Sequence, residues 1–206
     1  MAKQALVVKR EILFREGIFS GFVSTGQRDF IGHIMTNHFY HDRGEKLEND
    51  SSIQQIIPYV WIVNPKTKEV FAYRRASNQN YSEARLRNKW SCGVGGHIDF
   101  EDSGKENPIL SAMMRELMEE VKIAKYPRPK IVGYINDDSD IVNSVHFGVV
   151  AVAETDENVE KGDEEMAEGR FFSLSDLEKL FADSNVDVEK WTRTSWPFVK
   201  QYLLSL

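Results

Sequence analysis

The sequence contains a single cysteine, Cys92, among its 206 residues. One thiol cannot form a disulfide within the chain, and it cannot supply a zinc site built from several thiolates. Long apolar runs are also missing, because the longest uncharged stretch, residues 51–65, contains Gln, Asn and Pro and falls short of the roughly 20 apolar residues that span a bilayer. The apolar run at residues 5–8 is too short for a signal peptide. We therefore expect a cytoplasmic protein with no membrane partner.

Positive charge is scarce, since 26 Lys and Arg residues stand against 32 Asp and Glu residues and give a net charge of −6. A nucleic-acid phosphate backbone repels such a chain, so we expect no nucleic-acid polymer as a partner. Hydrophobic residues make up 41% of the chain, which is enough for a folded core. An anionic ligand would have to be held by a local basic patch or by a metal ion.

Runs of β-branched and aromatic residues alternate along the chain with turn residues and helical patterns. Strands are expected at residues 6–14, 18–23, 56–63, 70–73, 130–135 and 144–153, with a hairpin turn at 64–68 and a short strand ending at 171–172. Helices are expected at residues 108–121, from Ser173 or Ser175 to about 181, and at 187–204, with a mixed, partly helical stretch at 27–40. This order predicts an α/β or α+β sandwich on a mixed β-sheet.

The best helical segment, residues 108–121, begins with Asn107 as a good N-cap and Pro108 at a position that tolerates a missing N–H. At 100° per residue one broad apolar face is expected to pack on the sheet. Its members are Leu110, Met113, Met114, Leu117, Met118 and Val121. The glutamates of the helix, Glu116, Glu119 and Glu120, fall together on the opposite face by the same count.

Three carboxylates within one helical turn repel one another unless a cation lies among them, and carboxylate oxygens are the ligands that Mg²⁺ and Mn²⁺ prefer. Arg115 precedes Glu119 by four residues and can pair with it. A solvated outer helix face is the alternative interpretation of this cluster. The glycine-rich segment 93–98, which precedes the helix, favours a metal and phosphate site instead.

These motifs resemble the Nudix box, G-x5-E-x7-R-E-U-x-E-E-x-G-U with U aliphatic, over residues 96–123. The resemblance implies a Nudix-type α/β/α sandwich on a mixed sheet, which hydrolyses a diphosphate linked to another moiety with Mg²⁺ or Mn²⁺. It further implies Glu116 and Glu120 as metal ligands, and Glu119 as a further ligand or as a carboxylate oriented by Arg115. From these we take Glu119 and Arg115 as catalytic residues.

Two features depart from the Nudix pattern. Gly96 precedes Glu116 by 20 positions where the pattern gives 15, which is a five-residue insertion, and Lys122 replaces the glycine that follows the paired glutamates. The isolated glutamate of the box therefore has no aligned partner. The candidates for its place are Glu106, Glu101 and Asp102.

Further site residues are expected outside the helix. Residues 74–89 carry five cations and one acid, and from them we take Arg75 and Arg85 as phosphate-binding residues, because guanidinium groups bind phosphate through paired hydrogen bonds. Solvated surface positions are the alternative for each arginine. Gly95, Gly96 and His97 are expected to contact substrate, although His97 could instead bond only to the backbone.

The acidic stretch 154–168 is the source we expect for one more carboxylate that acts as general base or metal ligand in such enzymes. The candidates are Glu164, Glu165 and Glu168, of which we take Glu165 as the catalytic residue.

The chain is thus expected to be a metal-dependent hydrolase of a small-molecule diphosphate of the nucleoside-diphosphate-X type. Residues 1–50 would form an extension packed on a catalytic domain at 51–206, and the additions at both ends allow a homodimer. Two alternatives remain open at this point: an isomerase of the isopentenyl-diphosphate type, which would use Cys92, and a non-catalytic sensor of a nucleotide-like ligand.

Overall fold

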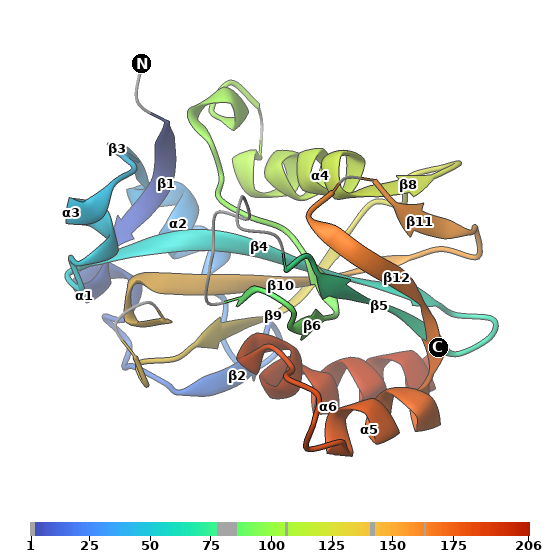
Figure 1. Cartoon of the computed structure of the whole chain (residues 1–206). Helices are drawn as coiled ribbons and strands as arrows, with labels where there is room; N and C mark the ends of the chain where they lie inside the picture. The colour runs from blue at the N-terminus through green and yellow to red at the C-terminus, as the bar shows by residue number, and fades with distance from the viewer. Residues whose placement is uncertain (1–2, 78–85, 106, 141–142, 163) are drawn as a thin grey trace. The chain divides into compact units, whose positions relative to one another are not determined.

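A computed structural model gives the structure of the chain and describes residues 3–77, 86–105, 107–140, 143–162 and 164–206 (Figure 1). The chain divides into two compact units. Unit 1 comprises Met1–Tyr59, Gly96–Met113 and Ile131–Ala151. Unit 2 comprises Val60–Gly95, Met114–Lys130 and Val152–Leu206. Helices and a mixed sheet together give the expected α/β class.

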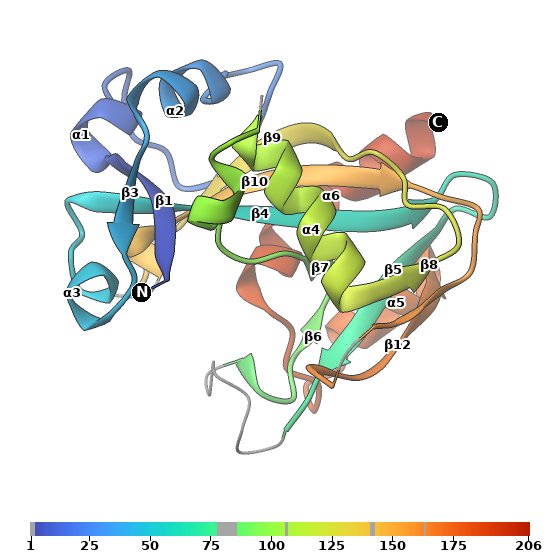
Figure 2. The ribbon, with the colours of Figure 1, turned by 90° about the horizontal axis from the view of Figure 1, so that it is seen from above.

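The sheet of unit 1 is built around the first half of a long strand. Its strands are β1 (Gln4–Lys9), β2 (Gly21–Ser24), β3 (Phe39–Asp42), the start of β4 (Ile53–Asn64), β9 (Lys130–Asn136) and β10 (His146–Glu154). β1 pairs antiparallel with both β3 and β4, and β10 lies between β4 and β9, which confirms the predicted pairing of the last two strands. β2 completes this edge by pairing antiparallel with β9. The short helices α1 (Arg10–Leu13), α2 (Ile31–Asn37) and α3 (Glu45–Glu48) follow β1, β2 and β3 (Figure 2).

The expected strand at residues 6–14 is wrong beyond Lys9, because residues 10–13 form the helical turn α1. The Arg10 guanidinium donates to the Asp138 carboxylate at 2.7 Å and to the Ser144 carbonyl at 3.1 Å. Phe14 then enters a cluster of aromatic rings. The rings of this cluster, Phe14, Phe19, Phe30, Tyr134 and Phe147, have centroids 5.1–6.2 Å apart. Tertiary contacts of this kind override local β propensity.

Unit 2 contains the predicted hairpin, in which Val63 of β4 faces Val70 of β5 (Glu69–Arg75). Along its other edge β5 pairs antiparallel with β12 (Met166–Ser173), and these strands lie side by side in Figure 1. The short strands of this unit are β6 (Trp90–Ser91), β7 (Gly93–Val94), β8 (Val121–Ile123) and β11 (Val159–Lys161). Helices α5 (Leu174–Ala182) and α6 (Lys190–Ser205) match the expected C-terminal helices, and Ser173 caps α5 by accepting from the Asp176 N–H at 3.2 Å.

Helix α4 (Pro108–Glu120) forms as expected, and the Asn107 side chain accepts from the Leu110 N–H at 3.1 Å at its start. The predicted apolar face of this helix is confirmed at Met113, Leu117 and Val121, which are buried, and is wrong at Met118, which is 55% exposed. The buried positions are Pro108, Ile109, Ala112, Met113, Glu116, Leu117 and Glu120. At 100° per residue they occupy an arc of about 180°, and the face is rotated by about one residue from the prediction. Two of the three glutamates therefore face inward with the apolar side chains.

Among the residues that the structure describes, no helix is both long enough and apolar enough to cross a membrane.

Candidate functional site

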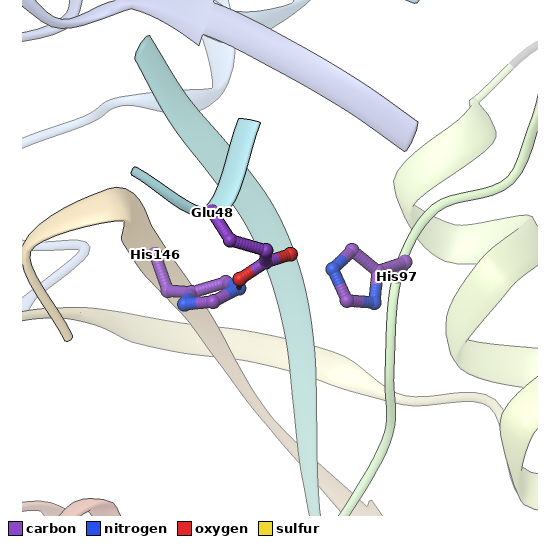
Figure 3. A group of neighbouring side chains, drawn as sticks. All are labelled: Glu48, His97 and His146. Carbon is purple, nitrogen blue, oxygen red and sulfur yellow. Dashed lines mark ion pairs between the residues drawn. The ribbon is translucent and has the colours of Figure 1, made fainter. Parts of the chain in front are cut away.

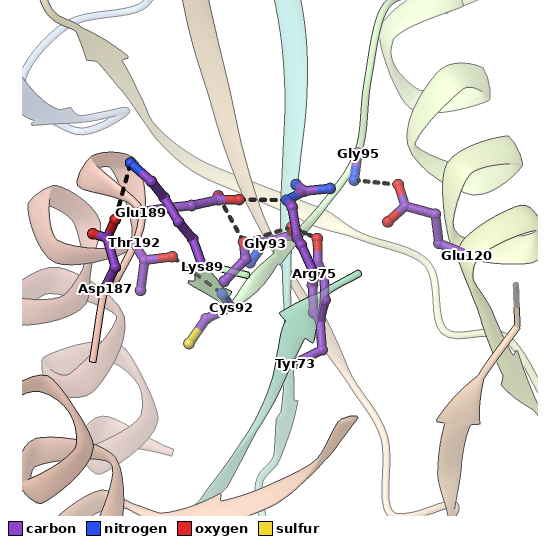
Figure 4. A network of polar contacts seen from close by, with 11 residues as sticks. Tyr73, Arg75, Lys89, Cys92, Gly93, Gly95, Glu120, Asp187, Glu189 and Thr192 are labelled. Carbon is purple, nitrogen blue, oxygen red and sulfur yellow. Dashed lines mark hydrogen bonds and ion pairs between the residues drawn. The ribbon is translucent and has the colours of Figure 1, made fainter. Parts of the chain in front are cut away.

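The centre of the candidate site is the contact between the glycine-rich segment and the end of α4 (Figure 4). The Gly95 N–H donates to Oε1 of Glu120 at 3.1 Å. Gly95 adopts φ of 152°, a backbone conformation that residues with a Cβ rarely adopt. Glycine at this position therefore allows the backbone to turn its N–H toward the carboxylate.

Glu116 and Glu120 are both buried, with 9% and 7% of their surface exposed. They lie four residues apart on α4, so that their side chains are neighbours on one face. Two like charges withdrawn from water at adjacent positions destabilise the fold unless a cation lies close by. Their donor atoms are carboxylate oxygens, which Mg²⁺ and Mn²⁺ prefer, so the residues present fit such an ion.

Arg115 links the buried and the exposed glutamates of α4. One of its guanidinium nitrogens donates to Glu116 at 2.8 Å and to Glu119 at 3.2 Å. The Glu119 side chain is 57% exposed, whereas that of Glu116 is 12% exposed. Arg115 thus holds Glu116 in place and offsets part of the negative charge of the helix, while Glu119 remains accessible to solvent.

A second buried network lies on the other side of the glycine-rich segment and includes the predicted residue Arg75 (Figure 4). The Arg75 guanidinium donates to Glu189 at 2.5 Å, and the hydroxyl of Ser91 donates to the other carboxylate oxygen of Glu189 at 2.8 Å. The Tyr73 hydroxyl donates to the Gly93 carbonyl at 2.8 Å. This network fixes β5, β6 and the segment that leads to Gly95.

Sequence patterns did not identify Glu189, because it belongs to no motif and lies far along the chain from Arg75. The backbone brings it into place. The Trp90 N–H donates to the Asp187 carbonyl at 2.8 Å, and the Glu189 N–H donates to the Trp90 carbonyl at 2.9 Å. No local sequence signal predicts this pairing of residues almost a hundred positions apart.

The structure places the other predicted residues in different surroundings. Glu165 is exposed, and its backbone carbonyl accepts from the Ala76 N–H at 2.8 Å next to the end of β5. Glu168 pairs with Arg74 at 2.7 Å. Arg85 and Glu106 lie outside the described residues.

The two remaining candidates for the isolated glutamate of the box belong to a 3-10 turn at Phe100–Asp102. Glu101 is exposed, whereas Asp102 is buried and accepts from the Asp99 N–H at 3.1 Å. Asp102 thus has a local capping role in this turn.

Gly96 and His97 belong to unit 1. The His97 ring contacts the side-chain oxygen of Gln55 through Nε2 at 2.9 Å. Burial, together with the positive charges of Arg43, His146 and Lys3, lowers the pKa of His97 well below its usual value. The imidazole is therefore neutral at physiological pH.

Cys92 is buried between β6 and β7, and its N–H donates to the Thr192 hydroxyl at 3.1 Å. Burial, reinforced by the charge of Glu189, raises the pKa of the Cys92 thiol well above its ordinary value. A buried neutral thiol is a poor nucleophile, and this removes the feature on which the isomerase alternative depended.

Comparisons with known protein sequences give two matches. A family model of the NUDIX domain matches residues 54–193. The chain is 32% identical to protein YmaB of Bacillus subtilis (strain 168) over 189 residues, which cover 87% of this chain and 89% of that protein.

Solved structures show the same fold. The crystal structure of Tm1382 is 27% identical, with a TM-score of 0.76 over 97% of this chain and 99% of that one. The NUDIX domain of Shewanella oneidensis NrtR, complexed with ADP ribose, is 14% identical, with a TM-score of 0.53 over 74% of this chain and 89% of that one.

Proposed function

Because the chain belongs to the Nudix domain family and is a Nudix hydrolase, we propose that it cleaves the diphosphate linkage of a nucleoside-diphosphate-X small molecule in a reaction that requires Mg²⁺ or Mn²⁺. The observation that carries this proposal is the buried pair Glu116 and Glu120 beside the Gly95 N–H. Such a carboxylate pair is stable in a folded protein when a cation neutralises it.

Glu116 and Glu120, with Glu119 as a further ligand, would hold the metal ion. When bound, the ion supplies charge neutralisation for the diphosphate and lowers the pKa of a water molecule. Arg115 orients Glu116 and Glu119 through its two ion pairs, and we propose that Glu119 acts in catalysis through its accessible carboxylate. Glu165 is proposed as the general base, supported by its exposed position beside the end of β5.

Substrate binding is proposed for the glycine-rich segment and for the basic stretch that precedes it. The proposed residues are Gly95, Gly96, His97, Arg75 and Arg85. The absence of a side chain at Gly95 supports this role, because it lets a phosphate approach the backbone of the segment closely. The cations of residues 74–89 would balance the negative charge of the diphosphate.

We also propose that residues 1–50 form an extension of a catalytic domain at 51–206, which the start of the family match at residue 54 supports. A homodimer and a cytoplasmic location complete the proposal. Sedimentation velocity tests the oligomeric state, since one protomer of this chain and a pair of protomers differ twofold in mass.

The experiment for the activity uses the full chain and a panel of nucleoside diphosphates linked to a sugar, an alcohol or another nucleotide. ADP ribose is the first member, because the Shewanella NUDIX domain was solved with it. We expect phosphate-containing products with Mg²⁺ or Mn²⁺, none with a chelator, and recovery when the ion is restored. Turnover that is unaffected by the chelator would contradict the metal requirement, and no turnover of any member at high enzyme concentration would contradict the substrate class.

A further inference from the structure

Three metal-ligand side chains of unit 1 converge although they are far apart in the sequence (Figure 3). Glu48 ends helix α3, His97 follows Gly96, and His146 begins strand β10. One ligand atom from each side chain lies within 4.8 Å of the other two. The local structure of α3 or of β10 does not bring these three side chains together, so the tertiary fold assembles the cluster.

The members of the cluster differ in their exposure to solvent. The His146 side chain is 13% exposed, while that of Glu48 is 37% exposed. The histidine side of the cluster is therefore shielded from water, and the carboxylate side is open to solvent. A cation could enter beside Glu48 and exchange its water ligands for imidazole nitrogens.

Gln55 is fully buried and holds two members of the cluster together. Its side-chain oxygen lies 2.9 Å from Nε2 of His97, and its side-chain nitrogen donates to Glu48 at 3.3 Å. Polar partners of this kind orient metal ligands and maintain their spacing. The rings of His97 and His146 lie with their centroids 5.7 Å apart at 71°, so that they do not stack face to face.

We propose that Glu48, His97 and His146 bind one divalent transition-metal ion, with Zn²⁺ as the ion tested first. Two imidazoles and a carboxylate are a ligand set that zinc uses, and imidazole selects such metals over Mg²⁺. The carboxylate of Glu48 and Nε2 of His146 are 4.0 Å apart, compared with about 3.4 Å between neighbouring ligands of tetrahedral zinc. Small side-chain rotations close this gap.

The bound ion would join three segments of unit 1 that no disulfide can join, since the chain has one cysteine. It would stabilise the folded state by binding it in preference to the unfolded chain. This site shares His97 with the proposed substrate-binding residues, but its metal binding can be tested apart from the proposed hydrolysis. Its ligands include nitrogen, whereas those of the α4 glutamates are all oxygen.

The test uses the full chain without a histidine tag, freed of metal by a chelator and then titrated with zinc chloride. Binding is measured by calorimetry and by the thermal unfolding midpoint, and Co²⁺ replaces Zn²⁺ for the visible absorption that nitrogen ligation produces. The variants are His146→Gln and Glu48→Gln, with His41→Gln as the matched histidine control outside the cluster. Circular dichroism without metal confirms that each variant is folded, and Glu48→Gln removes only a half-exposed charge.

We expect the wild type and the His41→Gln variant to bind one Zn²⁺, with a higher unfolding midpoint and a Co²⁺ spectrum. The His146→Gln and Glu48→Gln variants should bind Zn²⁺ at least tenfold more weakly, and the Glu116→Gln/Glu120→Gln double variant should retain this binding. The proposal is overturned if the wild type binds no Zn²⁺. It is also overturned if His146→Gln and Glu48→Gln bind Zn²⁺ as tightly as the wild type.

Discussion

The N–H of Gly95 and the carboxylate of Glu120, 25 positions apart in the sequence, are joined by a hydrogen bond of 3.1 Å. The bond connects the glycine-rich segment to the last residue of α4. A backbone N–H that points at a buried carboxylate fixes its orientation and offsets part of its charge. This contact brings the glycine-rich segment and the glutamates of the motif together.

Replacing Glu120 by Gln should preserve the fold, because the amide oxygen can still accept from Gly95. It should lower diphosphate hydrolysis by about 100-fold or more, since even the partners that orient metal ligands contribute 10–100-fold to metal affinity or activity and Glu120 is proposed as a ligand itself. The rate is measured at saturating Mg²⁺. Glu178→Gln, on the exposed face of α5, is the matched control and should be unchanged. Equal rates in Glu120→Gln and the wild type would remove Glu120 from the proposed ligands.

The buried ion pair between Arg75 and Glu189 should make the stability of the chain depend on both partners. Arg75→Met leaves the Glu189 charge buried without its cation, and we expect a loss of about 3–5 kcal/mol in the free energy of unfolding. Glu189→Leu alone should have a similar effect. In the double variant much of the loss should be recovered, because neither charge then remains buried. Urea unfolding of the four proteins measures the coupling, and strictly additive losses would show that the pair does not act as a unit.

Gly162 lies against the C-terminal end of α4, where its N–H donates to the Glu120 carbonyl at 2.7 Å. A Cβ at this position would meet the Glu120 carbonyl carbon at 2.7 Å and the Glu119 carbonyl oxygen at 2.8 Å. Gly162→Ala should therefore displace the end of the helix, destabilise the protein by about 1–3 kcal/mol and reduce hydrolysis. Gly32→Ala is the control, since no atom lies within 4 Å of the added Cβ. A Gly162→Ala protein with normal stability and rate would refute the argument.

The Cys92 thiol should resist labelling in the folded protein. Its raised pKa keeps it protonated at pH 8, and it is buried. A thiol reagent should label it at the normal rate only in urea. Because the folded pKa exceeds that of the unfolded thiol, about 8.5, the unfolded state loses its proton first and the free energy of unfolding should fall as the pH rises above that value. Rapid labelling of the native protein would contradict this picture.

Local sequence patterns were sufficient to predict the elements whose caps and turns depend on residues a few positions apart. Asn107 and Pro108 predict the start of α4, and the turn residues 64–68 predict the β4–β5 hairpin. The start of α5 is predicted at Ser173 or Ser175, and the structure shows Ser173 as the cap. These features depend on capping and turn geometry, which neighbouring residues control. The sequence also identified the Nudix motif, which the match over residues 54–193 confirms.

Long-range contacts determined the burial and the charge partners that local sequence patterns could not predict. They turned Glu116 and Glu120 inward, although hydrophobicity alone placed them on the outer face of α4. They brought Glu189 to Arg75, and His146 to Glu48 and His97. A residue's helical or strand propensity is a local property, whereas its burial and its charge partners depend on segments that meet only in the folded chain. The sequence alone excluded a disulfide within the chain, because it contains a single cysteine. Only the tertiary structure showed that the Cys92 thiol is buried and neutral.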